Sequence, residues 1–360
     1  MGSQYRLDIH TAAGIKLAEV TDFWQLSYTR RVNAPGVLTF TLSSGHPVVS
    51  QLENKSQVIV YRRNETLGLD WTPEFTGLYR AQQRRYTNRS AFTATCPGCM
   101  TMLAWRIVAW RAGVTNRSTF DSKRAETVLK TLVSYNAGAQ ATMANGRLRD
   151  GAITGITVQA DDGGGNAISI GCSYSNLLEQ LQKVASVGGG DFDLAKTGPA
   201  TWEFRWYAGQ RGVDRTAEVL FALERGNMAE PEYTYDRTEE RTVAIAAGQG
   251  EGADRVVTIR TGPDYSADND IEVFADARGS ETVAGVESSA DARLEQTRAR
   301  EQFAFRVVQT TGCAYGVHYG LGDLVRAQYE GINIVQKVVG VTVTLAKDGR
   351  EQIDVETETV

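Results

Sequence analysis

The 360-residue chain has few prolines and cysteines and no long apolar run. Its 7 Pro contrast with 36 Gly, and the cysteines at positions 96, 99, 172 and 313 are too few and scattered for a disulfide framework. No stretch approaches the roughly 18 consecutive apolar residues that a membrane-spanning helix needs. We therefore expect reduced cysteines and no stable membrane insertion.

Lysine is also scarce, with 8 residues against 30 arginines, and the formal net charge is −5. This balance gives no general attraction to nucleic acid, whose non-specific binding needs clustered basic side chains. Arginine pairs occur at 30–31, 62–63 and 84–85, at or beside predicted strand ends. We expect these pairs to be solvated or to contact another subunit rather than to follow a phosphate backbone.

The N-terminal residues carry no targeting pattern. Met1-Gly-Ser-Gln-Tyr-Arg6 has neither the apolar run of a secretory signal nor the Ser or Thr that myristoylation requires at position 6. We expect the protein to be made in a cytoplasm and to leave it only within a larger particle.

Alternation of apolar and polar residues with a period of two dominates both ends of the chain and predicts strands. Strands expected near the N-terminus, with the turn-marked spacing of a small barrel or sandwich, are 4–10, 23–29, 36–42, 57–61, 74–81 and 90–95. Near the C-terminus we expect one strand to begin in 321–325 and two more to follow at 336–345 and 351–358, with a turn at 347–349. The order strand, loop, strand, strand thus occurs at both ends, which suggests two similar barrels.

The middle of the chain predicts an α+β region. Apolar residues at helical spacing occur in 100–110 and 122–136, and a third helix follows Asn176, a plausible N-cap with Glu179 three residues later. Gly188-Gly-Gly190 would end that helix, and strands 191–194 and 201–207 would pair. Beyond 241 we expect strands 242–246 and 255–260 and a polar helix over 288–302.

Cys96-Pro-Gly-Cys99 is the sharpest local motif. A Cys-x-x-Cys can be a redox pair or half of a zinc site, but no second such pair or His-x-x-x-His is present to complete the zinc ligands. A Pro-Gly turn between a strand and a helix explains the motif without chemistry. We favour the turn, and a redox or metal role for Cys96 and Cys99 stays open.

Other motifs also have simpler interpretations. Gly248-x-Gly-x-Gly252 lacks the residues of a Walker or dinucleotide loop, and the acidic stretches 161–166 and 264–272 do not fit an EF-hand. Asp191 and Asp193 share a strand face at about 7 Å, but no partner accompanies them for glycoside cleavage. We expect Trp202 and Trp206 to pack in a core rather than line a sugar cleft. The sequence predicts no catalytic, cofactor-binding or metal-binding residue and no enzyme activity.

The order of several motifs resembles the hub protein at the tail tip, or baseplate, of long-tailed, siphovirus-type phages. The resemblance covers most of the chain and rests on Thr95–Val108 around the cysteine motif, Ala125–Val133, Tyr174–Gln182, Phe204–Arg215, Glu224-Arg-Gly-Asn-Met228, Gly248–Gly252 and Leu321-Gly-Asp-Leu-Val325. Cys96 and Cys99 depart from the family pattern at the hinge after the first barrel.

The resemblance implies a mainly β, α+β fold that assembles as a trimeric ring. We expect an N-terminal tube-like β-barrel at 1–98, an α+β middle domain at 99–236 and a second β-barrel at 237–360 with a helical insertion at about 283–303. Two barrels in each of three subunits would present an approximately sixfold ring to a sixfold tail tube.

The implied function is structural. Such a hub closes the tail tube, contacts the distal tail or tube protein, the tape measure protein and the fibre or receptor-binding proteins, and lets DNA pass without sequence-specific binding. It would reside in the virion tail tip, and in the host cytoplasm during assembly. Two alternatives stay open: a tail-associated carbohydrate-binding or cell-wall-degrading protein, and the hub of a contractile injection or gene-transfer particle.

Overall fold

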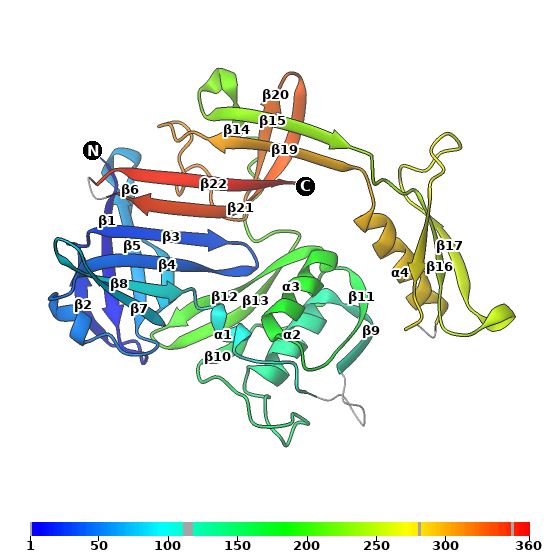
Figure 1. The fold of residues 1–360 in the computed structure, drawn as a ribbon, viewed down its shortest axis with the longest axis horizontal. Helices are drawn as coiled ribbons and strands as arrows, with labels where there is room; N and C mark the ends of the chain where they lie inside the picture. The colour runs from blue at the N-terminus through cyan, green and yellow to red at the C-terminus, as the bar shows by residue number, and fades with distance from the viewer. Residues whose placement is uncertain (1, 111–117, 280–281, 347–348) are drawn as a thin grey trace. The chain divides into compact units, whose positions relative to one another are not determined.

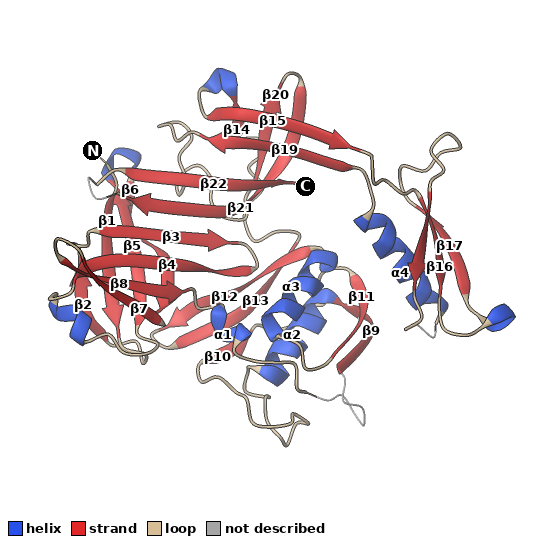
Figure 2. Cartoon of the chain, viewed as in Figure 1, coloured by secondary structure: helices blue, strands red, loops and turns tan. Residues whose placement is uncertain are grey.

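A computed structural model describes residues 2–110, 118–279, 282–346 and 349–360 (Figure 1). Strands predominate and helices are few (Figure 2), so the mainly β prediction is confirmed. The chain divides into two compact units. Unit 1 comprises Met1–Glu230, Phe305–Glu358 and Val360, and unit 2 comprises Pro231–Ala304 and Thr359.

Unit 1 contains an eight-stranded sheet that takes strands from both ends of the sequence. Its order is β14-β20-β21-β3-β4-β8-β7, and β22 also pairs with β21. The strands are β3 (Gln25–Arg31), β4 (Ala34–Ser43), β7 (Ala81–Tyr86), β8 (Ser90–Pro97), β14 (Leu220–Ala222), β20 (Leu324–Tyr329), β21 (Ile332–Leu345) and β22 (Glu351–Thr359).

The two halves of this sheet meet where β21 pairs antiparallel with β3. Gly340 lies opposite Arg31, and five further pairs lead to Leu345 opposite Leu26. Strands from both expected barrels share one sheet, and no sheet of the described residues closes, so the two barrels are not shown. Sequence periodicity identifies a strand but not its distant partner, which is why this shared sheet was not predicted.

A second sheet of unit 1 packs against β3. Its order is β2-β1-β5-β6, with strands β1 (Gln4–His10), β2 (Lys16–Val20), β5 (Gln57–Asn64) and β6 (Leu69–Leu78). The fully buried Tyr28 of β3 contacts the rings of Tyr5 and Phe75, with centroids 6.5 and 6.1 Å away. These contacts hold the two sheets face to face.

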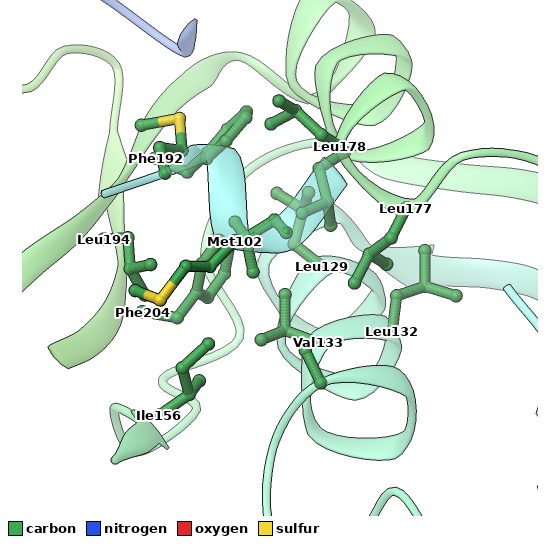
Figure 3. Close-up of a cluster of buried hydrophobic side chains, with 14 of the residues drawn as sticks. Met102, Leu129, Leu132, Val133, Ile156, Leu177, Leu178, Phe192, Leu194 and Phe204 are labelled. Atoms are coloured by element: carbon green, nitrogen blue, oxygen red, sulfur yellow. The ribbon is translucent and has the colours of Figure 1, made fainter. Parts of the chain in front are cut away.

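The middle region of unit 1 has its own core, in which α2 and α3 pack together beside β12 and β13 (Figure 3). Asn176 caps α3 by accepting the Glu179 N–H, and Gly189 ends the helix in the left-handed conformation, so both predicted helix signals are confirmed. The elements are α1 (Thr101–Ala104), β9 (Ser118–Arg124), α2 (Ala125–Asn136), β10 (Ile156–Val158), β11 (Ala167–Cys172), α3 (Leu177–Gly188), β12 (Gly190–Gly198) and β13 (Thr201–Ala208).

Two predicted helices are shorter than their apolar spacing suggested. The helix expected over 100–110 ends at Ala104, because the following backbone pairs instead with 174–176: Val108 N–H donates to Ser175 and Tyr174 N–H to Val108. The helix expected from 122 begins at Ala125, because the residues before it continue β9, which pairs with β11. Tertiary pairing overrides local helical spacing at both places.

Unit 2 is a small three-stranded sheet with one helix. Helix α4 (Val283–Gln296) buries Val286, Ala290 and Leu294 with the alanines of the sheet, whose order is β17-β16-β18. The strands are β16 (Val243–Ala247), β17 (Val257–Thr261) and β18 (Glu272–Asp276). A separate pair is formed by β15 (Met228–Asp236) and β19 (Arg300–Val307), of which Pro231–Asp236 and Arg300–Ala304 belong to unit 2.

The polar helix predicted over 288–302 is displaced. It starts earlier, where Thr282 caps it, and residues 300–302 belong to β19. Of the turn predicted at 347–349, residues 347 and 348 lie outside the described residues. The described residues also contain four short 3-10 turns: Pro47–Ser50, Glu65–Leu67, Leu223–Arg225 and Gly252–Asp254.

Candidate functional site

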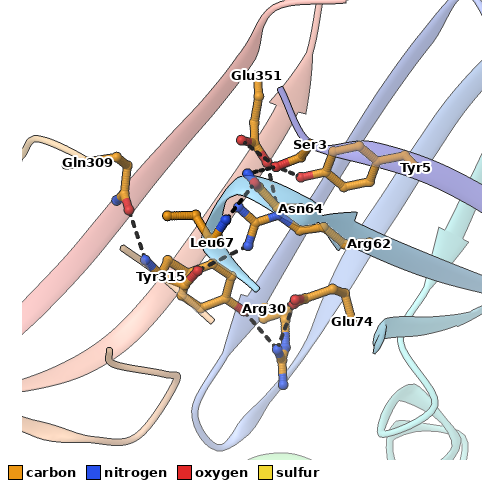
Figure 4. Close-up of polar contacts among 10 residues, drawn as sticks. All are labelled: Ser3, Tyr5, Arg30, Arg62, Asn64, Leu67, Glu74, Gln309, Tyr315 and Glu351. Atoms are coloured by element: carbon orange, nitrogen blue, oxygen red, sulfur yellow. Dashed lines mark hydrogen bonds and ion pairs between the residues drawn. The ribbon is translucent and has the colours of Figure 1, made fainter. Parts of the chain in front are cut away.

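Five side chains of unit 1 form a polar cluster, here called the junction cluster, in which Arg62, Glu74 and Tyr315 are buried and Arg30 and Glu351 are partly exposed (Figure 4). The first three come from β3, β5 and β6, and the last two come from the C-terminal part of the chain. The cluster therefore links segments that are more than 240 residues apart in sequence.

Arg62 is the most deeply buried cation of the cluster, with 1% of its surface exposed. Its Nε donates to Glu351 Oε1 at 2.9 Å, and its Nη1 donates to the Tyr315 carbonyl oxygen at 3.0 Å. The Tyr5 hydroxyl also donates to Glu351 Oε1, and Ser3 donates to Glu351 Oε2 at 2.9 Å. The charge of the Arg62 guanidinium is thus balanced by the Glu351 carboxylate, and its N–H donors have acceptors, as a buried guanidinium requires.

Arg30, Glu74 and the Tyr315 hydroxyl form a closed triangle. Arg30 Nη1 donates to Glu74 Oε2 at 3.1 Å and to the hydroxyl at 2.7 Å, and the hydroxyl donates to Glu74 Oε2 at 3.0 Å. Burial raises the pKa of Tyr315, so its hydroxyl keeps its proton at neutral pH. Burial alone would lower the pKa of Arg30, but Tyr315 and Glu74 outweigh it and raise that pKa. We conclude that these groups bind one another and supply no free nucleophile or base.

The prediction for two arginine pairs is wrong in part. Arg30 and Arg62 pair within the chain instead of being solvated or meeting another subunit, whereas Arg31 is half exposed beside Glu356. Side chains alternate along a strand, so one arginine of each pair turns inward. Strand alternation could have indicated in the sequence that one arginine of each pair is buried. No local pattern identifies the carboxylates that pair with these arginines, Glu74 and Glu351.

A cleft of about 500 Å³ adjoins the junction cluster, with Arg30 and Glu74 in its wall. Its other charged lining residues are Arg31, Asp193, Lys196 and Arg211. No tryptophan lines it, and Trp202 and Trp206 lie in the core of the middle region, which confirms the prediction of core packing. The aromatic residues that do line the cleft are Tyr61 and Phe75.

The carboxylates of β12 are both occupied by partners. Asp191, 1% exposed, accepts from Lys337 Nζ at 2.7 Å, from Asn33 Nδ2 at 3.1 Å and from the Arg211 backbone N–H at 2.8 Å. Asp193 pairs with Arg211 at 2.6 Å. Asp191 thus ties the middle region to the sheet through Lys337 and Asn33, and Asp193 pairs within the middle region.

Two motifs that are distant in sequence meet at Asp323. The Asp323 carboxylate accepts from Val213 N–H at 2.7 Å, from Arg215 Nε at 3.0 Å and from Gly320 N–H at 2.7 Å. A Cβ added at Gly212 would lie 2.3 Å from the Asp323 nitrogen, so the two backbones are in close contact. The Asp of Leu321-Gly-Asp-Leu-Val325 is thus buried, and its carboxylate holds the backbone at Val213 and at Gly320 together by hydrogen bonds.

The remaining glycine motifs form turns. In Glu224–Met228, Gly226 has φ of 65°, and buried Asn227 accepts from Ala222 N–H at 2.9 Å. The Gly248–Gly252 loop connects β16 to β17, and Arg255 Nε closes it by donating to the Gly248 carbonyl oxygen at 3.0 Å. The side chain of Arg255 is turned back onto the loop, which leaves no arrangement typical of a phosphate cradle.

The Cys96–Cys99 segment passes from β8 into α1, as the turn interpretation predicts. Both thiols are buried and free, and Cys99 Sγ donates to the Thr76 carbonyl oxygen at 3.5 Å. Burial raises the pKa of both thiols, and that of Cys99 reaches about 12. Among the described residues no three His, Cys, Asp or Glu side chains gather as a metal site, and no helix there has the length and apolar character to cross a bilayer.

These thiols should be inert in the folded protein. A raised pKa leaves the protonated thiol dominant at pH 8, and burial blocks access, so Ellman's reagent should label none of the four cysteines within minutes and all four in guanidinium. Fast labelling of Cys96 or Cys99 in the native protein would contradict this and favour a redox role. The variant Cys172→Ser provides a control for the count in denaturant.

Comparison with known protein families shows that one family model matches nearly the whole chain. The family described as Siphovirus ReqiPepy6 Gp37-like protein matches residues 6–357. Among curated proteins, none matches the chain.

Solved structures of tail proteins share the fold. A tail protein from Neisseria meningitidis MC58 is 12% identical, with a TM-score of 0.59 over 99% of this chain and 97% of its own. The prophage tail protein gp18 from Listeria monocytogenes EGD-e is 10% identical, with a TM-score of 0.60 over 99% and 94%. The E. coli c3393 protein, described as a type VI secretion component similar in structure to T4 tail proteins gp27 and gp5, is 10% identical, with a TM-score of 0.50 over 98% and 76%.

Proposed function

Because the chain belongs to the siphovirus ReqiPepy6 Gp37-like family and has the fold of phage tail proteins, we propose that it is the hub of a phage tail. Three copies would form a ring that closes the distal end of the tail tube. The ring would adapt a sixfold tube to a threefold tip, in the virion of the assembled phage and in the host cytoplasm before assembly.

The observation that carries this proposal is the junction between β21 and β3. A chain that joins strands from its two halves edge to edge in one sheet would supply one lateral contact of the proposed ring. If an equivalent contact forms between copies, three chains provide six alternating junctions, which is the arrangement that an approximately sixfold ring requires. The three sequence segments 1–98, 99–236 and 237–360 remain our proposed domains.

The proposed partners are structural proteins. One face of the ring would bind the distal tail or tube protein, and the other would hold the tape measure protein and the fibre or receptor-binding proteins. DNA would pass through during ejection, and the net charge of −5 is consistent with weak adhesion of DNA to the ring.

One alternative function has a specific observation in its favour. The likeness to a type VI secretion component covers 98% of this chain, which is compatible with a hub of a contractile injection or gene-transfer particle. The carbohydrate-binding or cell-wall-degrading alternative has no comparable support, because the carboxylates of β12 are held by cations and a backbone donor.

Immunogold electron microscopy of purified particles, with an antibody against this chain, tests the proposal. We expect gold at the distal tail tip of a flexible, non-contractile tail. Gold along the tube or at the capsid would contradict the hub role, and gold on a contractile particle would favour the alternative. Zymography on host cell wall is the companion measurement, and clearing by the purified chain would contradict a purely structural role.

A further inference from the structure

The strand β7 is an uncovered edge of the eight-stranded sheet. All six of its residues are exposed, and its neighbour in the sheet is β8 alone. Its outer backbone N–H and C=O groups therefore lack a strand partner among the described residues, and such an edge readily pairs with another chain. Arg84 and Arg85, on opposite faces of β7, have no carboxylate within ion-pair distance in the described part of the structure.

The junction of β21 with β3 provides a template for such pairing. Six residues of β21, Gly340–Leu345, lie opposite the last six of β3. Two side-chain rungs accompany the backbone ladder: Ser27 with Thr344 at 3.1 Å and Thr29 with Thr342 at 3.0 Å. The register is thus fixed on one face of the sheet.

Each strand of this junction has a counterpart elsewhere in the chain. The six residues of β7 directly precede β8 in the order of strands, as Gly340–Leu345 of β21 precede β22. Strand β15 pairs with β19 as β3 pairs with β4. The connection between β3 and β4 is Val32 and Asn33, and residues 237–299 occupy the corresponding position between β15 and β19.

We propose that β7 of one copy pairs antiparallel with β15 of a second copy, in the register that β21 adopts on β3. This inference rests on the proposed ring and identifies the contact between copies. Aligning Tyr86 with Leu345, and Asp236 with Arg31, places Arg85 opposite Glu232 and Gln83 opposite Thr234. The Arg85–Glu232 rung takes the place of the Ser27–Thr344 rung.

The chemistry of β15 fits this partner. Its exposed acidic residues are Glu230, Glu232 and Asp236, and β15 is an edge strand with β19 as its neighbour. Glu232 has no ion-pair partner among the described residues, so it is free to meet an arginine. Pro231 falls opposite Tyr86, at the end of the ladder, where a missing N–H costs no interior hydrogen bond.

A contact of this kind closes into a ring when the rotation between successive copies closes. The basic edge of each copy meets the acidic edge of the next, so the interface is heterologous and head to tail. Internal β21–β3 junctions and external β7–β15 junctions then alternate around the ring. The arginines of β7, which on an isolated edge discourage aggregation, here select an acidic partner.

The test is a cysteine pair at the predicted rung. Directly opposite residues have Cβ atoms roughly 4.5–5.5 Å apart, so the double variant Arg85→Cys/Glu232→Cys should form disulfides between copies under mild oxidation. We expect dimers and closed trimers on a non-reducing gel. The offset pair Arg84→Cys/Glu232→Cys is the control, because adjacent residues of a strand face opposite sides. Wild type, whose cysteines are buried, should give no cross-link.

Charge reversal gives an independent readout. Arg85→Glu or Glu232→Arg alone should weaken association about fivefold per junction, and the double reversal should restore it. If trimers form but neither cross-linking nor rescue is seen, the β7–β15 contact is wrong while the hub function stands. If the chain stays monomeric with all its tail partners present, both the contact and the ring fail.

Discussion

Replacing Glu351 by alanine is expected to lower the free energy of unfolding by about 3 kcal/mol, because it leaves the guanidinium of Arg62 buried without its carboxylate. The substitution also removes the acceptor of the Tyr5 and Ser3 hydroxyls. Guanidinium denaturation followed by tryptophan fluorescence measures the effect. The loss of stability should affect the unfolding of unit 1, since every partner of Glu351 in the junction cluster lies there.

Glu356→Ala is the matched control on the same strand. Glu356 pairs with Arg31 at 2.7 Å, but both side chains are about half exposed, so this variant should lose less than about 1 kcal/mol. Equal losses for the two variants would show that the buried cluster contributes no more than a surface ion pair, and the junction cluster would lose its structural role.

Gly98→Ala is expected to destabilise the chain by about 2–3 kcal/mol or to prevent folding. The added Cβ would lie 1.8 Å from the Pro35 carbonyl oxygen, which belongs to the backbone of β4, and 3.2 Å from the Phe75 ring. Neither neighbour can move aside cheaply, because Gly98 N–H also donates to Gly36 at 3.2 Å. Thermal unfolding monitored by circular dichroism measures the change.

Gly45→Ala serves as its control. The nearest atom to an added Cβ there is the Ser43 hydroxyl, 4.0 Å away, and the backbone does not need a left-handed conformation. We expect a change within about 0.5 kcal/mol. A Gly98→Ala protein as stable as Gly45→Ala would contradict the close approach of the turn to β4.

Local pattern predicted several elements of the fold well. The strand expected over 4–10 is β1 (Gln4–His10), and the capped helix after Asn176 is α3, because alternation and capping are decided by neighbours in sequence. The predicted pairing of the strands around 191–194 and 201–207 also occurs, as β12 with β13. A short connection makes such a hairpin the simplest solution.

Long-range features could not be predicted in the same way. Nothing near Leu26 or Leu345 in sequence indicates that these residues lie opposite each other, so the sheet shared by the two ends of the chain was not predicted. The inward turn of Arg62 was readable from strand alternation, but its partner Glu351 is 289 residues away. Conversely, the absence of a predicted catalytic site remains a prediction, tested by the cell-wall assay and not by the fold.

The mass of the purified chain in solution, by light scattering after gel filtration, tests the central claim most directly. Three copies of the 39.3 kDa chain, about 118 kDa, forming rings with a central opening in negative-stain averages, are the result that the hub assignment predicts. A monodisperse 39.3 kDa species that stays monomeric even when tail-tube protein is added would contradict it.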